Sequence, residues 1–251
     1  MKKHVLLFVV MLPFLVFSQN QPVISINGQT TNKHFDVSSG SRSVPPGTLL
    51  WSQPPYCENA FASQLAPNYP FDAKLADDFL FPVAPAQISA IRWWQIWFNG
   101  GYAAPSSFNV FIYNDNSCLP GTLVNSWNIP FLSSNEDAGC SVSFESREYW
   151  ASLNPAFVPA SNQHYWIVIQ PVLDFPPQTM LMESTVDNLC SAAMIFPEIG
   201  LYGWEAIDTD IAFEMYGVMS PPLETPVSSW ALVLGGVLIA GAVFMRYRRI
   251  S

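Results

Sequence analysis

Carboxylates are the residues with the clearest capacity for chemistry in this chain. Asp77 and Asp78 are adjacent, and Asp208 and Asp210 are separated by one residue. Carboxylate oxygens are preferred Ca²⁺ ligands, so these four residues form a candidate structural calcium site, although no stretch matches a complete calcium loop. The simpler alternative is turn capping and hydrogen bonding at strand ends. On a strand, Asp77 and Asp78 point to opposite faces, so at most one is expected to face the core.

A cluster of aromatic residues offers a second kind of chemistry, the stacking of rings on sugars. Trp93 and Trp97 share one face of a predicted strand, and Trp94 shares the other face with Phe98. One set fills the core, and the other is free to bind a saccharide if it is exposed. The candidate sugar-binding residues are Trp94, Trp97 and Tyr102. The alternative is that all of them pack inside the protein, with Arg92 covering one ring as a cation.

Hydrolytic chemistry has weaker support. Glycoside cleavage needs two opposed carboxylates, and the available pairs are Glu145 with Glu148, or Asp208 with Asp210. A Ser-His-Asp arrangement would have to use one of the two histidines of the body, His34 or His164, and no Gly-x-Ser-x-Gly motif occurs. The sequence therefore predicts a protein that is not an enzyme, with a secreted glycoside-directed hydrolase as one alternative.

The cysteines indicate disulfides rather than a metal. Cys57, Cys118, Cys140 and Cys190 make an even number, which in an oxidising compartment favours two disulfides with three possible pairings. Cys118 and Cys140 flank a hairpin-like segment, so we expect them to pair, and Cys57 to pair with Cys190. No Cys-x-x-Cys occurs and histidines are few, so a zinc site is not expected.

The elements that must position these residues are strands. The 22 prolines argue against a helical body, and short runs rich in aromatic and β-branched residues alternate with turn residues such as Asn114-Asp115-Asn116. We expect residues 47–217 to form an all-β domain, an antiparallel β-sandwich of jelly-roll-like kind. The expected strands are Thr48–Ser52, Leu75–Phe81, Gln87–Phe98, Phe108–Tyr113, Leu123–Asn128, Ser141–Trp150, His164–Gln170, Met180–Met182 and Ile211–Gly217.

The two ends of the chain point to the membrane. Residues 1–18 have two lysines, an apolar run and a small residue at the expected cleavage position, which is typical of a signal peptide. Residues 19–46 are expected to be a flexible leader, and residues 218–226 a proline-rich linker. From Val227 to Met245 the chain has no charge, enough for a helix of roughly 28 Å that spans a bilayer. Arginines follow at once, which predicts a cytoplasmic end. They are Arg246, Arg248 and Arg249.

The tail, residues 227–251 with the proline that precedes them, resembles the PEP-CTERM class of C-terminal sorting signals, which membrane enzymes called exosortases process. The shared parts are a short proline-containing motif, an apolar helix and a terminal arginine cluster. Here the motif departs from Pro-Glu-Pro and is similar to variants with Pro, Ser and Trp. It reads Pro226, Val227, Ser228, Ser229 and Trp230. The resemblance implies a Gram-negative bacterium, an exosortase-like partner, and transfer of the body to the cell surface or to an extracellular polysaccharide matrix. The alternative is a permanent single-span anchor.

The body resembles β-sandwich ectodomains of surface proteins that often carry such sorting signals. This likeness covers most of residues 48–217 and concerns mainly core positions, so it implies a fold and not an activity. The matching strings are Ala76-Asp77-Asp78-Phe79, Ile88-x-x-Ile91-x-Trp93-Trp94, Phe108-x-Val110-x-Ile112-Tyr113, Pro120-Gly121-Thr122-Leu123, Tyr165-Trp166-Ile167-x-Ile169 and Asp210-Ile211-Ala212-Phe213.

Charge excludes one class of partner. All 19 acidic residues lie between the two ends, and only five of the ten basic residues do, so the exported part has a formal charge of −14. Such a surface repels nucleic acid. We therefore expect a non-enzymatic, exported surface or extracellular-matrix protein without a cofactor other than structural Ca²⁺. The alternative within the same class is a carbohydrate-binding sandwich domain.

Overall fold

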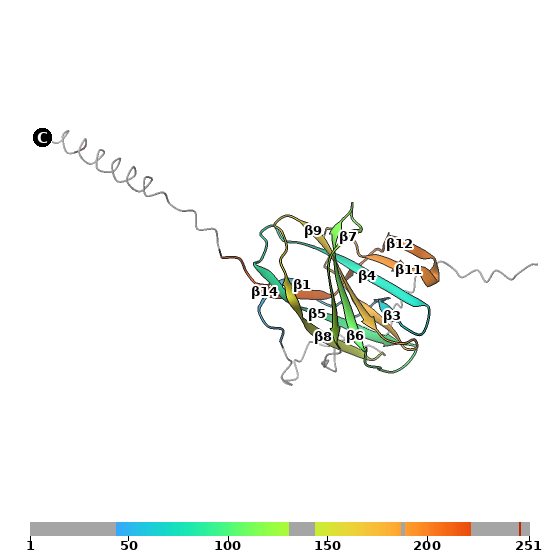
Figure 1. Cartoon of the computed structure of the whole chain (residues 1–251). Helices are drawn as coiled ribbons and strands as arrows, with labels where there is room; N and C mark the ends of the chain where they lie inside the picture. The colour runs from blue at the N-terminus through green and yellow to red at the C-terminus, as the bar shows by residue number, and fades with distance from the viewer. Residues whose placement is uncertain (1–43, 131–143, 187–188, 222–245, 247–251) are drawn as a thin grey trace, which may run out of the picture. The chain divides into compact units, whose positions relative to one another are not determined.

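The computed structural model describes residues 44–130, 144–186, 189–221 and 246, and its body is all-β (Figure 1). The chain divides into two compact units, Met1–Met219 and Ser220–Ser251, and the described strands all belong to the first. Alternating apolar runs bounded by turn residues produce these strands, as the pattern predicts. They are β1 (Thr48–Gln53), β2 (Ala60–Ala62), β3 (Gln64–Ala66), β4 (Phe71–Leu80), β5 (Gln87–Phe98), β6 (Ser107–Asp115), β7 (Pro120–Pro130), β8 (Ser146–Phe157), β9 (His164–Val172), β10 (Gln178–Ser184), β11 (Ala193–Phe196), β12 (Leu201–Ala206), β13 (Asp210–Ile211) and β14 (Phe213–Val218), with one 3₁₀ turn, η1 (Pro197–Ile199).

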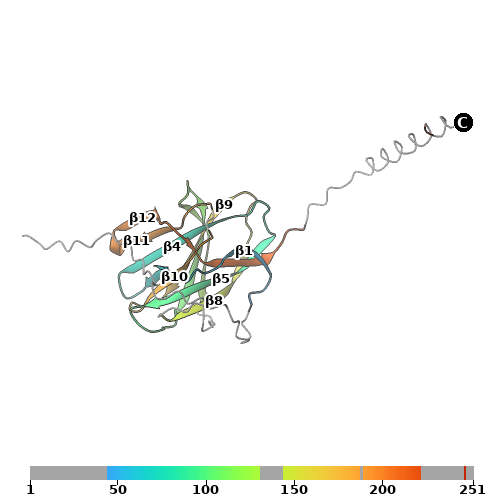
Figure 2. The same ribbon diagram turned by 180° about the vertical axis from the view of Figure 1, so that it is seen from behind.

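Two seven-stranded sheets make up the body. In the first, the strands run in the order β1-β14-β5-β10-β13, with β2 paired to β10 and β8 paired to β5 (Figure 2). In the second, the order is β12-β11-β4-β3-β9-β6-β7, and β4 also pairs with β9. The described pairings are antiparallel except that of β3 with β9. This arrangement is compatible with the expected β-sandwich.

The main core is formed by one face of each sheet. Odd-numbered side chains of β4 and β9 and even-numbered side chains of β6 all turn to this side, because successive residues of a strand face opposite ways. Trp93, Trp97, Phe79 and Phe108 are fully buried here. Trp93 lies edge-on to Phe108 with ring centroids 5.0 Å apart, so β5 of one sheet contacts β6 of the other through aromatic packing.

The opposite faces of both sheets are also partly covered. On the second sheet, Trp166 and Val168 of β9 pack with Ala76 of β4 and with Cys190, which lies just before β11. On the first sheet, Trp94 packs with methionines of β10. Strands that are buried on both faces read as continuous apolar runs, which is why β5 and β9 lack a polar alternation.

Most of the predicted strands are confirmed, two differ in their bounds, and several short strands were not predicted. The predicted strand 211–217 is two strands, β13 and β14, which belong to different ladders. The predicted strand 141–150 is found further along the chain as β8, and residues 141–143 lie outside the described residues. β2, β3, β11 and β12 were not predicted, because they are only three to six residues long.

Within the described residues, no helix is long and apolar enough to cross a membrane. The predicted span at residues 227–245 lies outside them, as do the signal peptide and most of the leader and of the linker. Of the predicted sorting residues only Arg246 is described, and it is helical and exposed.

Candidate functional site

The adjacent carboxylates Asp77 and Asp78 lie on β4 and are both fully buried, each with 0% of its surface exposed. The prediction that they point to opposite faces is consistent with the neighbouring residues, since Phe79 lies in the core between the sheets and Ala76 lies on the covered outer face. The expectation was that at most one of them faces the core, and the structure adds that the other, Asp78, is buried on the outer face as well. The outer face of β4 is covered here by the segment that carries Cys190, which no local pattern of β4 reveals.

Asp77 connects the two sheets. Its Oδ2 accepts hydrogen bonds from Gln53 Nε2 of β1 at 2.8 Å and from the Ile211 backbone N–H of β13 at 2.6 Å. Its Oδ1 accepts the backbone N–H of Asp78 at 2.7 Å. Burial, followed by the charge of Asp210, raises the pKa of Asp77 well above its usual range. The three donors satisfy this carboxyl and give it a structural role.

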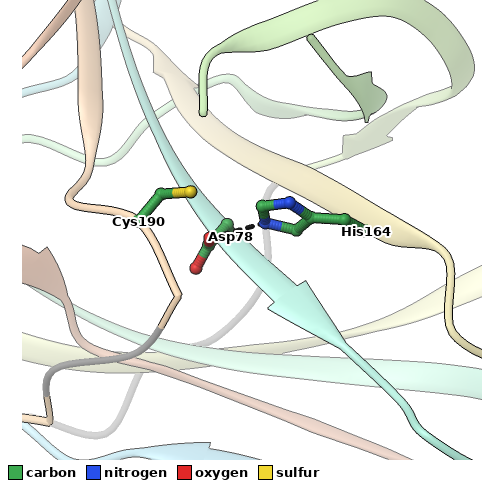
Figure 3. A group of neighbouring side chains, drawn as sticks. All are labelled: Asp78, His164 and Cys190. Carbon is green, nitrogen blue, oxygen red and sulfur yellow. Dashed lines mark hydrogen bonds and ion pairs between the residues drawn. The ribbon is translucent and has the colours of Figure 1, made fainter. Parts of the chain in front are cut away.

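Asp78 begins a chain of acidic and basic groups on the outer face (Figure 3). Its Oδ2 lies 2.5 Å from Nε2 of His164 on β9, and the other ring nitrogen, Nδ1, lies 3.3 Å from Asp115 Oδ1 at the end of β6. Burial raises the pKa of Asp78 to about 6, and the hydrogen bond with His164 opposes that rise. The backbone of Cys190 is close enough to lower this pKa slightly, but Asp78 Oδ1 completes no hydrogen bond of ordinary geometry.

Asp115 positions the turn between β6 and β7. Its carboxylate accepts the backbone N–H groups of Ser117 and Cys118, both at 3.1 Å, and the indole N–H of Trp166 at 2.9 Å. Ser117 and Cys118 have positive φ angles of 58° and 62°, so the carboxylate stabilises a tight turn that most residues avoid. The turn chemistry was predicted from the sequence, and its consequence is that Cys118 is held beside β11.

Cys118 is bonded to Cys190, and this corrects the expected pairs of Cys118 with Cys140 and of Cys57 with Cys190. The bond joins the β6–β7 turn to the segment before β11, across 72 residues of sequence. Sequence proximity favoured Cys140, but tertiary pairing of β4 with both β9 and β11 brings the distant cysteine to the turn. Cys57 is also disulfide-bonded, and Cys140 lies outside the described residues.

A pocket of about 490 Å³ lies at the start of β13. Every side chain that lines it ends in a hydroxyl, carboxyl or amide group, and four of them are acidic. The lining residues are Tyr56, Glu58, Asn59, Glu183, Ser184, Thr185, Ser191, Asp208, Thr209 and Asp210. Inside it, Asn59 Nδ2 donates to Glu183 Oε1 at 2.8 Å, and Thr209 Oγ1 donates to Glu183 Oε2 at 3.2 Å. The hydrogen bond to Glu58 and the nearby negative charges raise the pKa of Tyr56.

The four carboxylates of the candidate calcium site therefore have different surroundings. Asp208 is exposed and, with the buried Asp210, lines the pocket. Asp77 bonds to backbone and amide donors, and Asp78 bonds to His164. Asp210 interacts electrostatically with the other two buried members, since its charge raises the pKa of both Asp77 and Asp78. The structure thus places only Asp208 and Asp210 together at a space that a ligand can enter.

The candidate sugar-binding aromatics are not exposed. Trp94 is 5% exposed and Trp97 is 0% exposed, and the Trp97 indole donates to the Ala103 carbonyl at 3.1 Å. Tyr102 is half-buried, packs edge-on against Trp97 at 5.1 Å and lies under the guanidinium of Arg147. The two tryptophan rings are therefore inaccessible to a saccharide, and Arg147 lies over the Tyr102 ring. Arg92 lies 5.9 Å from the Trp94 ring centroid, as the cation–π alternative expected.

Of the candidate hydrolytic carboxylates, Glu145 directly precedes β8 and Glu148 lies on it, and each carboxylate has a different basic partner. Glu145 pairs with Arg147 at 2.8 Å, whereas Glu148 is buried and lies 3.5 Å from Arg92. Asp208 and Asp210 share the pocket, but Asp208 is exposed and Asp210 is buried. His164 lies between two carboxylates, and His34 lies outside the described residues.

No family model matches the chain, and no curated protein and no solved structure matches it either.

Sequence reasoning missed several members of both groups. Glu58 and Asn59 directly precede β2 and Glu183 lies on β10, so the pairing of β2 with β10 brings these two segments of the pocket together. Asp115 was recognised as a turn residue but not as a partner of His164. The polar Asp115 at the end of an apolar strand, and the histidine that begins another, are the only local signals that pointed to this cluster.

Proposed function

We propose that the protein is a non-enzymatic component of a bacterial cell surface or extracellular matrix, with an exported jelly-roll-like body. The observation that carries the proposal is the Cys118–Cys190 disulfide. Disulfides persist in oxidising compartments and are rare in the bacterial cytoplasm, so the bond fits a domain that works outside the inner membrane. None of the described cysteines is free, which agrees with the same location.

In this proposal the two ends of the sequence direct export and surface sorting. The signal peptide at residues 1–18 directs the chain to the export machinery, and the apolar segment 227–245 holds it in the inner membrane. An exosortase-like enzyme then removes the tail at or near the Pro226–Trp230 motif. The acidic body is released to the surface or to a polysaccharide matrix.

The experiment compares the full chain in two Gram-negative hosts, one with an exosortase and one from which that enzyme has been deleted. Surface protein from the first host should have an intact mass that lacks Arg246–Ser251, and protein from the second should keep these residues in the membrane fraction. Replacing the motif proline, Pro226→Ala, should slow processing, whereas Pro221→Ala in the linker should not. An intact C-terminus on surface protein from the first host refutes the sorting step.

A second candidate function is carbohydrate binding, and the pocket is the observation that favours it. Ten polar side chains surround a volume of about 490 Å³, which suits a ligand rich in hydroxyl groups. Carboxylates such as Glu183 and Asp210 accept hydrogen bonds from sugar hydroxyls or hold a Ca²⁺ that bridges to them. This version of the hypothesis uses the pocket in place of the buried tryptophans.

Binding to a glycan array with and without added Ca²⁺ tests the second candidate. Glu183→Gln should abolish the binding of any saccharide recognised at the pocket. Glu205→Gln is the matched control, because Glu205 is exposed on β12 and is not among the residues that line the pocket. Saccharide binding that survives Glu183→Gln, or no binding to any glycan, contradicts a role for this pocket.

A further inference from the structure

The group formed by Asp78, His164 and Cys190 has a donor set that neither the export route nor the polar pocket uses. We propose that, when the Cys118–Cys190 disulfide is reduced, Cys118, Cys190, His164 and Asp78 bind a zinc-class divalent metal ion. In the oxidised protein the disulfide links Cys118 to Cys190, and in the reduced protein the bound metal ion links the same two residues.

The positions of the donor atoms carry the first step. One ligand atom each from Asp78, His164 and Cys190 lie within 4.8 Å of one another. Bonds from zinc to oxygen, nitrogen and sulfur are about 2.0 to 2.3 Å long, so the ligands of a tetrahedral site lie roughly 3 to 4 Å apart. Figure 3 shows the Cys190 sulfur directed toward the carboxyl and imidazole groups. Small side-chain rotations therefore bring these three atoms to bonding positions.

The fourth ligand follows from the disulfide itself. Cys118 is not among the three residues whose ligand atoms lie within 4.8 Å of one another, but its sulfur is bonded to that of Cys190 and becomes a thiol beside the cluster after reduction. The resulting set is two thiolates, one imidazole and one carboxylate. Sulfur and nitrogen ligands favour zinc over calcium, which prefers oxygen.

An unsatisfied atom gives independent support. Asp78 is 0% exposed, and its Oδ1 is one of the few buried side-chain atoms of the described residues without a hydrogen-bond partner. A buried carboxylate oxygen without a partner is costly, and a cation bound beside it removes that cost. The atom belongs to the same carboxyl group that contacts His164 through Oδ2.

His164 also has the second partner that metal-binding histidines commonly have. Asp115 Oδ1 lies 3.3 Å from Nδ1, on the far side of the ring from Asp78. A proton on Nδ1 that is donated to Asp115 leaves the lone pair of Nε2 free for the metal. Asp115 is itself fixed by the indole N–H of Trp166 and by the backbone N–H of Cys118, so the ring orientation is set before a metal arrives.

The redox step balances with a dithiol as the reductant. One thiolate of the dithiol attacks a sulfur of the Cys118–Cys190 bond and releases the other cysteine as a thiolate. The second thiolate of the dithiol then attacks the resulting mixed disulfide and releases the first cysteine. Cys118 and Cys190 together gain two electrons and two protons and become thiols, and the dithiol is oxidised to a disulfide. Zinc binding then releases the two thiol protons. Two thiolates and one carboxylate contribute three negative charges, so the loaded site carries a net charge of −1.

Cobalt(II) is the probe for the experiment, because its absorption reports both geometry and sulfur ligation. The full chain in detergent is reduced with a phosphine without oxygen and titrated with Co²⁺ and then Zn²⁺. We expect one equivalent of Co²⁺ to give the visible bands of a tetrahedral site and a thiolate charge-transfer band in the near ultraviolet. Zn²⁺ should abolish both, and the oxidised protein should show neither.

Variants assign the ligands. Cys118→Ser/Cys190→Ser should abolish the charge-transfer band, and His164→Gln should weaken affinity on the order of 100-fold. Asp115→Asn should weaken it roughly 10- to 100-fold, as expected for a group that orients a ligand. Cys57→Ser is the matched control, since it removes a cysteine outside the cluster, and it should leave the spectrum unchanged.

Near-ultraviolet circular dichroism monitors whether the tryptophans stay packed. If reduction unfolds the body, metal should restore the native spectrum. Three results overturn the proposal: no charge-transfer band in reduced protein, a band that persists without Cys118 and Cys190, or reduced protein that unfolds and is not restored by metal.

Discussion

Removal of the Cys118–Cys190 disulfide tests how the structure stabilises the turn that carries Cys118. The bond closes a loop with a sequence separation of 72 residues. In the chain-entropy description, such a loop costs the unfolded state about 15 cal/mol/K, which gives about 4.4 kcal/mol at 25 °C. We therefore expect Cys118→Ala/Cys190→Ala to lower the free energy of unfolding by about 4 kcal/mol.

Urea unfolding of the oxidised body, followed by tryptophan fluorescence, measures this change. The expected result is a lower midpoint with a slope that is unchanged or larger, because the unfolded chain without the cross-link exposes at least as much surface. Tyr202→Ala is the control, since Tyr202 is 81% exposed and should change stability by no more than about 0.5 kcal/mol. A loss below about 1 kcal/mol for the double variant would refute the assignment of this bond as a major constraint.

Three further substitutions test other features by the same unfolding assay. Asp77→Ala leaves three buried N–H donors without an acceptor and should cost at least about 3 kcal/mol, whereas a loss below about 1 kcal/mol contradicts the sheet-connecting role. Trp97→Ala removes a fully buried indole and should cost about 3–5 kcal/mol, and a neutral result contradicts its core position. Gly217→Ala places a Cβ in steric overlap with the backbone oxygen of Gln87 and should cost about 1–3 kcal/mol or more. Gly203→Ala is its control, because nothing lies within 4 Å of the added Cβ, and equal effects of the two changes refute the steric argument.

The candidate sites show the reach of sequence reasoning. Asp77 and Asp78 were chosen as chemical residues, and both are central to the structure. Their predicted role as calcium ligands followed from their type alone, whereas their observed partners come from three other strands and one loop. Trp94 and Trp97 were correctly placed on opposite faces of one strand, but exposure depends on what covers each face. The segments that cover these two faces lie tens of residues away in the sequence.

The sequence by itself determined the all-β class, the long strands and the turn at Asp115, because these depend on periodicity and on local backbone chemistry. Only the tertiary structure decided which cysteine pairs with Cys118 and which carboxylates share a pocket. It also decided that His164 lies between Asp78 and Asp115. The physical reason is that strand pairing sets these proximities, and a strand pairs with partners selected by the packing of two whole sheets, not by distance along the chain.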